Sequence, residues 1–220
     1  MRGVVRGWLT AGAIALVAAA SSAQTVDVPS IVDSRDGQRY DVVSINGRDW
    51  LARNLAFAAT PSWCYGDRLE GCGQHGRLYQ WDVAMSACAG LRASPAPGDR
   101  LPPPDPVSVT TGWRLPSDRD WMDLEVALGM QRSDLEREGP RGSDQGARLR
   151  SGGSSGLAIL LSGYRRPAGD YARRNERAAF WAATEANAED AWHRDIRPDV
   201  DTIYRSPVTK SYALSVRCVR

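Results

Sequence analysis

Residues 36–55 read DGQRYDVVSINGRDWLARNL, and two dipeptides in this stretch decide the class of fold. Asp36-Gly37 and Asn46-Gly47 both tolerate the positive φ angles that tight hairpin turns require. The residues between the two turns alternate as in a half-buried strand, and a return strand follows the second turn. The sequence therefore predicts a small antiparallel meander over residues 31–55.

Two helices are expected further along the chain. Ser117 and Asp120 have capping-box spacing, and an apolar stripe follows that stops at Gly129, so a helix is predicted from about Asp118 to Leu128. An earlier set of residues recurs at spacings of three and four and predicts a helix that ends near Gly90. Its members, which we expect to form a core face, are Leu78, Trp81, Ala84, Met85 and Cys88.

Two segments lack a regular pattern. Residues 91–111 hold six prolines and are interpreted as an exposed insertion loop. Residues 131–156 mix glycine and serine with charges, which favours a flexible surface connection. Short apolar runs in the rest of the chain predict strands, and a sheet built from both ends would bring the termini close together. These runs are residues 158–161, 179–183, 191–196, 202–204 and 212–219.

The N-terminus is typical of a secretory signal. Residues 1–23 contain two early arginines, a 12-residue apolar run and a small-residue end at Ala23. That run is shorter than the roughly 20 residues that a membrane-spanning helix needs, so cleavage before Gln24 is favoured over an uncleaved anchor. The sequence thus predicts an exported protein, periplasmic or extracellular, with a single domain at residues 24–220.

Four cysteines lie in the exported part. An even count in an oxidising compartment indicates two disulfides, and three pairings are possible. We favour Cys64 with Cys72, which closes a short loop, and Cys88 with Cys218, which ties the C-terminal strand to the middle of the chain. A zinc site is disfavoured because the chain has no C-x-x-C pair and only two histidines, His75 and His193.

The charge balance speaks against nucleic acid as a partner. The chain has 28 Lys and Arg residues and 26 Asp and Glu residues. Loss of the signal with its two arginines leaves equal numbers of basic and acidic residues. Nucleic-acid binding depends on a basic face that makes many phosphate contacts. No later stretch is apolar enough to span a bilayer, so we expect no stable membrane span after signal cleavage.

Seven short motifs in order resemble the Fibrobacter succinogenes major paralogous domain family over residues 31–220. They are DGQRY (36–40), WLARNL (50–55), CYGD (64–67), GRLYQW (76–81), GWRLPS (112–117), WAATE (181–185) and SVRCVR (215–220). The resemblance implies an α+β, C-type-lectin-like fold, with two helices packed on a small, twisted, mostly antiparallel sheet with long loops. It also supports the bridge between Cys88 and Cys218, although the insertion at 91–111 departs from the family.

Six residues are candidates for ligand binding. Four aromatic side chains lie among turn or polar residues and could line a groove: Trp63, Tyr65, Tyr171 and Trp192. Arg173 and Arg174 belong to a run of five arginines, residues 165–177, that could hold an acidic glycan or a cell-surface polymer. The alternatives are that most aromatic residues fill the core and that the arginines form a solvated loop.

No catalytic or metal-binding set is expected. His75 is interpreted as a turn residue and His193 as a solvent-facing strand residue, and neither has an evident nucleophile beside it. The calcium motifs of lectins of this fold are absent, and the scattered carboxylates offer too few ligands for calcium. We therefore expect a non-enzymatic binding or surface-interaction module without a cofactor. The alternatives are an enzyme like those that generate formylglycine, which would need a free thiol, and a ligand-free structural envelope protein.

Overall fold

The structure, a computed structural model, describes residue 3 and residues 29–95 and 112–220. Most of the predicted signal and most of the proline-rich insertion lie outside these residues. The described part is mixed α and β, with several small antiparallel sheets and few helices. This agrees with the predicted α+β class.

The first sheet is the meander that the two hairpin signals predict. Its order is β3-β2-β1-β6, with β1 (Ser30–Asp33), β2 (Arg39–Ile45), β3 (Arg48–Leu51) and β6 (Ala93–Pro95). Asn46 and Gly47 have φ values of 50° and 74°, as the tight β2–β3 turn requires. The prediction that the whole of 91–111 is an irregular loop is wrong, because residues 93–95 form strand β6 and pair with β1. Proline is tolerated there because β6 lies at the sheet edge.

The second sheet is the larger one. Its order is β10-β11-β12-β7, with β7 (Gly139–Arg141), β10 (Ala178–Glu185), β11 (Asp190–Ile196) and β12 (Ile203–Thr209). Two further antiparallel pairs are β4 (Ser62–Trp63) with β5 (Leu78–Tyr79), and β8 (Tyr164–Arg165) with β9 (Tyr171–Ala172). Of the five predicted strand runs, 158–161 and 212–219 form only isolated bridges.

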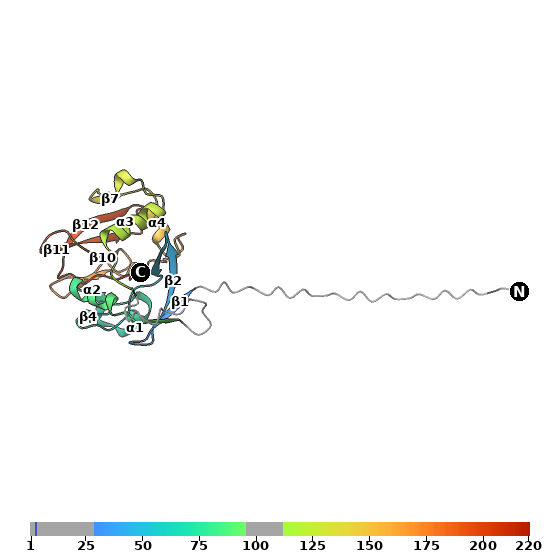
Figure 1. The fold of residues 1–220 in the computed structure, drawn as a ribbon, viewed down its shortest axis with the longest axis horizontal. Coiled ribbons are helices and arrows are strands. Elements are labelled where there is room, and N and C mark those ends of the chain that lie inside the picture. Colours follow the sequence, from blue (N-terminus) through green and yellow to red (C-terminus); the bar gives the residue numbers. More distant parts are fainter. Residues whose placement is uncertain (1–2, 4–28, 96–111) are drawn as a thin grey trace.

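Two helices cover opposite faces of β10 (Figure 1). Helix α2 (Trp81–Ala89) shares one core cluster with Ala179 and Trp181 of β10, and α3 (Asp118–Ala127) shares the other with Phe180. The predicted capping box of α3 is present. The predicted core face of α2 is partly wrong, because Met85 is exposed; the residues that α2 buries are Val83, Ala84, Ala87 and Cys88.

Residues 131–156 are folded, which contradicts the predicted flexible connection. They form a 3-10 turn (Arg132–Asp134), β7 and the short helix α4 (Gln145–Leu149), and Arg141 and Leu149 are buried. A further 3-10 turn (Tyr65–Asp67) precedes α1 (Leu69–His75). Both favoured disulfides, Cys64–Cys72 and Cys88–Cys218, are present.

The C-terminal residues join the two sheets. Val219 forms bridges to Trp50 of β3 and to Arg114, while Ser215 lies beside Phe180 of β10. Asp49 and Arg220 exchange backbone hydrogen bonds of 3.0 and 2.9 Å. The predicted closeness of the C-terminus to an N-terminal strand is thus present, although 212–219 is not a regular strand.

Candidate functional site

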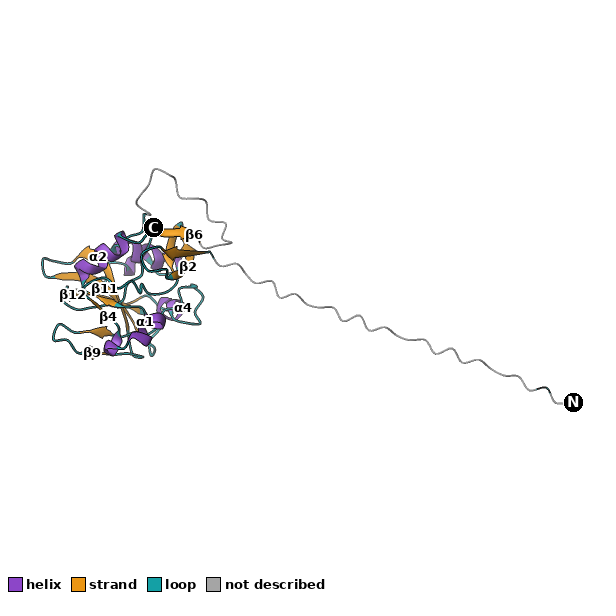
Figure 2. Cartoon of the chain, turned by 90° about the horizontal axis from the view of Figure 1, so that it is seen from below, coloured by secondary structure: helices purple, strands orange, loops and turns teal. Residues whose placement is uncertain are grey.

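The structure brings three of the four candidate aromatic residues to one place. Strand β4, helix α1 and strand β9 lie at the same end of the molecule (Figure 2). The rings of Tyr65 and Tyr171 are 5.2 Å apart between centroids. Arg165 lies over the Trp63 ring at 4.3 Å, and Arg174 lies 5.5 Å from the Tyr65 centroid. We call these five residues the aromatic–arginine face.

Local structure holds this face together from two directions. The disulfide of Cys64 with Cys72 fixes the chain between Trp63 and Tyr65. In the β8–β9 hairpin Arg165 is the direct partner of Tyr171, so both side chains lie on one side of that hairpin. The Tyr171 hydroxyl donates a hydrogen bond to Asp67, which links the hairpin to the turn after Cys64.

Ion pairs divide the five arginines of residues 165–177 into two groups. Arg166 pairs with Asp170 at 2.5 Å, Arg173 with Glu176 at 2.7 Å and Arg177 with Asp195 at 3.0 Å. Arg165 and Arg174 have no carboxylate partner within the part of the chain that the structure describes. Their guanidinium groups lie over aromatic rings instead, an arrangement that keeps a positive charge in place without neutralising it.

Two of the six candidate residues do not belong to this face. Arg173 is exposed and paired with Glu176, so Arg165 takes the place that sequence reasoning gave to Arg173. Trp192 lies on β11 under the guanidinium of Arg205, 3.4 Å from its ring centroid, and packs against the core. Polar residues follow it in the sequence, but strand alternation turns its ring toward α3 rather than toward a ligand surface.

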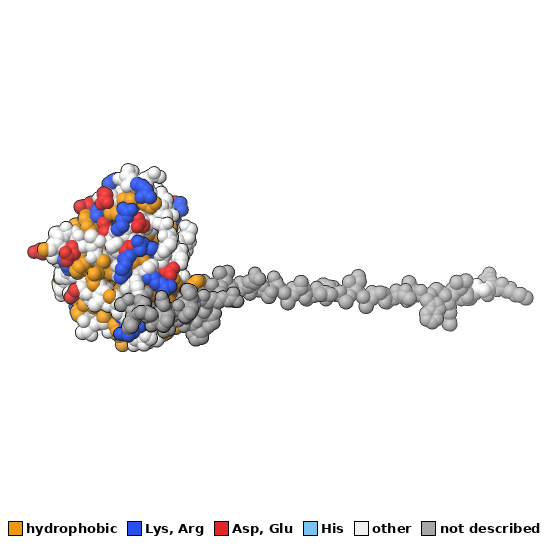
Figure 3. Space-filling view, viewed as in Figure 1, with side chains coloured by type: hydrophobic (Ala, Val, Ile, Leu, Met, Phe, Trp, Pro, Cys, Tyr) orange, Lys and Arg blue, Asp and Glu red, His pale blue; other side chains and the backbone are white. Residues whose placement is uncertain are grey.

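One face of the molecule carries no dominant sign of charge. On the face seen in Figure 3, basic, acidic and hydrophobic side chains are interspersed. Attraction of an anion would therefore depend on particular unpaired cations rather than on a field over the whole molecule.

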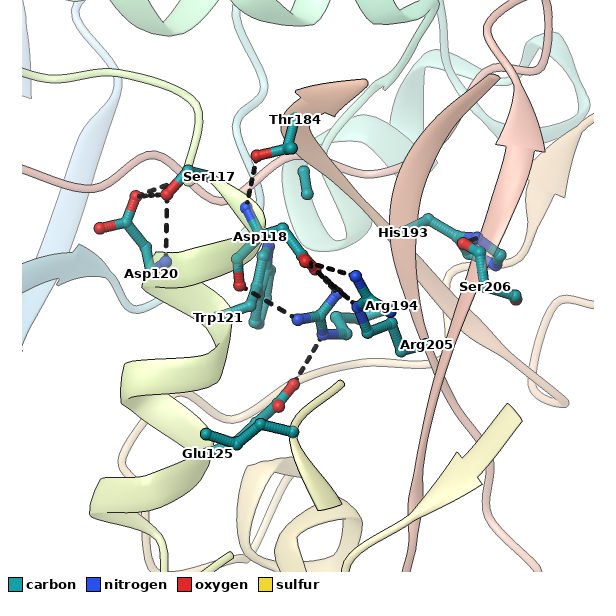
Figure 4. Close-up of polar contacts among 12 residues, drawn as sticks. Ser117, Asp118, Asp120, Trp121, Glu125, Thr184, His193, Arg194, Arg205 and Ser206 are labelled. Carbon is teal, nitrogen blue, oxygen red and sulfur yellow. Dashed lines mark hydrogen bonds and ion pairs between the residues drawn. The ribbon is translucent and has the colours of Figure 1, made fainter. Parts of the chain in front are cut away.

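A group of buried charges lies between α3 and the larger sheet (Figure 4). Arg194 donates to Glu125 at 2.6 Å and to Asp118 at 2.7 Å, and Arg205 donates to Asp118 at 2.7 Å. Arg141 adds a bond of 2.5 Å to Glu125. Burial alone would raise the pKa of Asp118, but its hydrogen bonds and charge contacts with Arg205 and Arg194 outweigh burial and lower it. The five side chains of this group are buried and pair with one another, and the Nε of Arg141 has no hydrogen-bond partner among the described residues.

The two histidines have structural neighbours that the sequence did not predict. His75 ends α1, is buried, and its Nδ1 lies 3.3 Å from the Ser162 hydroxyl. His193 is half-buried rather than solvent-facing and lies on the face of β11 opposite Arg194 (Figure 4). Burial is the main cause of a lowered pKa at both histidines, so both imidazoles are neutral near pH 7.

The structure offers little support for metal or thiol chemistry. Among the described residues, no group of three or more His, Cys, Asp or Glu side chains could hold a metal ion. All four cysteines are in disulfides. The described chain also contains no helix long and apolar enough to cross a membrane.

Comparison with known proteins gives one family. A family model described as the Fibrobacter succinogenes major domain matches residues 43–220, which is most of the chain. A search of curated proteins found no match. The matched range contains both disulfides and every residue of the aromatic–arginine face.

Proposed function

The chain belongs to the Fibrobacter succinogenes major domain family, and from this premise we propose that it is a binding module with a C-type-lectin-like fold. Two helices on a sheet, the long connections and the C-terminal bridge to Cys88 support that fold. Both disulfides fit a protein that is exported to the periplasm or beyond the cell.

The proposed ligand is an acidic glycan or a similar anionic polymer, bound at the aromatic–arginine face. The observation that carries this proposal is the pair Arg165 and Arg174, which lie over Trp63 and Tyr65 and have no carboxylate partner among the described residues. A guanidinium fixed over a ring still presents N–H groups at the guanidinium edge. Carboxylate or sulfate oxygens can accept hydrogen bonds from these groups. The neighbouring rings offer apolar faces to a sugar.

We propose no enzymatic activity. Chemistry of the formylglycine-generating kind requires a reactive thiol, and the cysteines here are oxidised. The purely structural alternative predicts that changes on the aromatic–arginine face leave every interaction unchanged, so the experiment below separates it from the binding proposal.

The test measures binding of immobilised polygalacturonate, with dextran as the neutral polymer. The double variant Arg165→Gln and Arg174→Gln removes the two unpaired cations, and we expect it to bind about tenfold or more weakly, because each charge-assisted contact contributes about 1.5 kcal/mol or more. The control, Arg166→Gln with Arg173→Gln, makes the same change of net charge at arginines that are already paired.

The comparison of the two double variants decides the outcome. Retained binding in the control and loss in the test variant support the proposal. Equal loss in both would show that only net charge matters, and equal binding of dextran would remove the acidic group from the recognition. Binding should also weaken as salt is added, because the arginines are partly exposed.

A further inference from the structure

The larger sheet has a pocket on the face that looks away from α3. Successive strand residues point to opposite faces, so Arg194 and Arg205 turn toward α3 while His193 and Ser206, which are register partners, turn the other way (Figure 4). Helix α2 packs over part of that second face, where Trp81 donates to the Ala182 carbonyl. The rest of it borders a pocket of about 210 Å³.

Three tyrosines and an apolar floor shape this pocket. Tyr164 of β8 and Tyr212 lie 5.9 Å apart between ring centroids, and Tyr204 comes from β12. The apolar residues are Ala179, Val208 and Leu214. The volume is below the roughly 300 Å³ at which pockets for drug-sized ligands begin, so the space suits one ring rather than two.

His193 supplies a hydrogen-bond acceptor with a fixed orientation. Its Nδ1 lies 2.7 Å from the Ser206 carbonyl oxygen, which can only accept, so Nδ1 carries the proton. Nε2 therefore holds a lone pair, and it makes no hydrogen bond with any residue that the structure describes. A hydroxyl or N–H group in the pocket could donate to it.

The polar rim has more positive than negative charge. Asp195 accepts one bond from Arg177 and one from Arg197, each of 3.0 Å, so two guanidinium groups share a single carboxylate. Their remaining N–H groups make no other hydrogen bond within the described residues. The Arg197 guanidinium lies 3.7 Å from the centroid of the Tyr204 ring, which fixes its plane beside the aromatic wall. A second hollow, of about 260 Å³, adjoins both arginines and adds Arg173, Glu176, Pro198 and Asp199.

We propose that this pocket binds a small organic carboxylate with a single ring. The ring lies among the tyrosines, the carboxylate accepts from Arg177 and Arg197, and a hydroxyl of the ligand donates to Nε2 of His193. Aromatic acids and sugar acids share this chemistry, since both present a flat or partly apolar ring and one anionic group. The site is separate from the aromatic–arginine face and does not depend on it.

Isothermal titration of the purified, disulfide-bonded protein tests the proposal with four probes. The acids are 4-hydroxyphenylacetate and galacturonate, and their neutral counterparts are 4-hydroxyphenethyl alcohol and galactose. We expect one of the acids to bind about tenfold or more tightly than its neutral counterpart, because Arg177 and Arg197 recognise the carboxylate. Binding of 4-hydroxyphenylacetate would identify the ligand class as aromatic acids, and binding of galacturonate would identify it as sugar acids.

Two variants locate the binding. Arg197→Gln should weaken binding of the acid about tenfold, while its control Arg166→Gln, which removes an exposed and paired arginine outside the pocket, should not. Ser206→Phe fills the pocket from a half-buried strand position and should abolish binding, with folding checked by thermal unfolding. The double variant Arg165→Gln and Arg174→Gln should bind the acid as the original chain does.

The proposal is overturned if neither acid binds, if the neutral probes bind as tightly as the acids, or if folded Ser206→Phe protein binds as the original chain does. None of these results bears on polymer binding at the aromatic–arginine face, because the residues differ.

Discussion

At the scale of single residues, Asp120 shows how one carboxylate stabilises the start of α3 and its surroundings. Its Oδ2 accepts from the backbone N–H and the hydroxyl of Ser117, both at 2.7 Å, and its Oδ1 accepts from Arg114 at 2.9 Å and Arg48 at 3.0 Å. Burial alone would raise the pKa of Asp120, but the hydrogen bonds from Arg114 and Ser117 outweigh burial and lower the pKa to about 2.

We predict that Asp120→Asn lowers the free energy of unfolding by about 2 kcal/mol at pH 7, because folding lowers the pKa of Asp120 from 3.8 to about 2. A depressed carboxyl pKa stabilises the fold above the unfolded pKa of 3.8, and this stability is lost as the pH falls toward 2. Denaturant unfolding at a series of pH values should therefore show the difference from the original chain closing between pH 4 and 2. A difference that persists at pH 2 would mean that the amide is poorly accommodated for steric reasons.

The matched control for this prediction is Asp123→Asn on the same helix. Asp123 makes an i,i+4 pair with Arg119 at the surface, and such pairs contribute about 0.5 kcal/mol or less. A cost as large as that of Asp120→Asn would point to net charge rather than to the capping contacts.

At the scale of elements, the β8–β9 hairpin can lie close to the turn that carries Tyr65 because Gly163 has no side chain. Gly163 has φ +68°, and a Cβ there would lie 2.4 Å from the Ala172 carbonyl oxygen and 2.7 Å from the Tyr65 ring. The same Cβ would lie 2.8 Å from the backbone nitrogen of Arg174. The close approach of hairpin and turn thus depends on one glycine.

We predict that Gly163→Ala is more destabilising than Gly152→Ala by about 1–3 kcal/mol, measured by urea unfolding. Gly152 has φ +84° with nothing within 4 Å of its Cβ position, so the control carries the backbone strain of about 1 kcal/mol without the collision. Gly163→Ala should also weaken polymer binding, because Tyr65 and Arg174 must move. Equal costs for the two variants would show that the hairpin can shift freely.

Local chemistry explains which elements the sequence could predict. The capping box at Ser117 and Asp120 and the turn at Asn46-Gly47 each depend on residues within four positions, so both are visible in the chain itself. Residues 131–156 are ordered by distant partners instead. Gly146 donates to the Asp201 carbonyl at 2.7 Å, and no local pattern reports a contact with a residue so far along the chain.

The candidate site could be predicted only in part for the same reason. Turn and polar neighbours in the sequence indicated Trp63, Tyr65 and Tyr171. Which carboxylate pairs with each arginine depends on the folded geometry, so the sequence could not separate Arg165 from Arg173. The pocket beside His193 left no signal in the sequence. It is assembled from β8, β10, β11, β12 and the C-terminal residues, and becomes visible only when these elements are placed together.

At the scale of the whole molecule, the C-terminal residues connect elements that have few other contacts. Arg217 is fully buried and has no carboxylate partner among the described residues; it donates to the Leu51 and Leu157 carbonyls at 3.0 and 2.8 Å and to the Asn54 side chain at 2.8 Å. Burial lowers the pKa of Arg217 to about 9, which leaves it charged at neutral pH. A buried cation satisfied by neutral oxygens fixes the meander and Leu157 to the C-terminal segment.

The two disulfides should therefore differ in how much they stabilise the fold. Cys88 and Cys218 are 130 positions apart, whereas Cys64 and Cys72 are 8 apart. In the chain-entropy model, closure of the longer loop contributes about 5 kcal/mol and closure of the shorter about 2.5 kcal/mol. All four residues are buried, so replacing each pair with alanine removes similar side chains from similar surroundings. We predict that the Cys88→Ala, Cys218→Ala variant loses about 2.5 kcal/mol more stability than the Cys64→Ala, Cys72→Ala variant in denaturant unfolding. Loss of the shorter bridge should instead act on function, because that bridge ties the segment that carries Trp63 and Tyr65 to α1. If both pairs cost the same in stability, the contacts of Arg217 and Val219 would be sufficient to hold the C-terminus without its covalent bond.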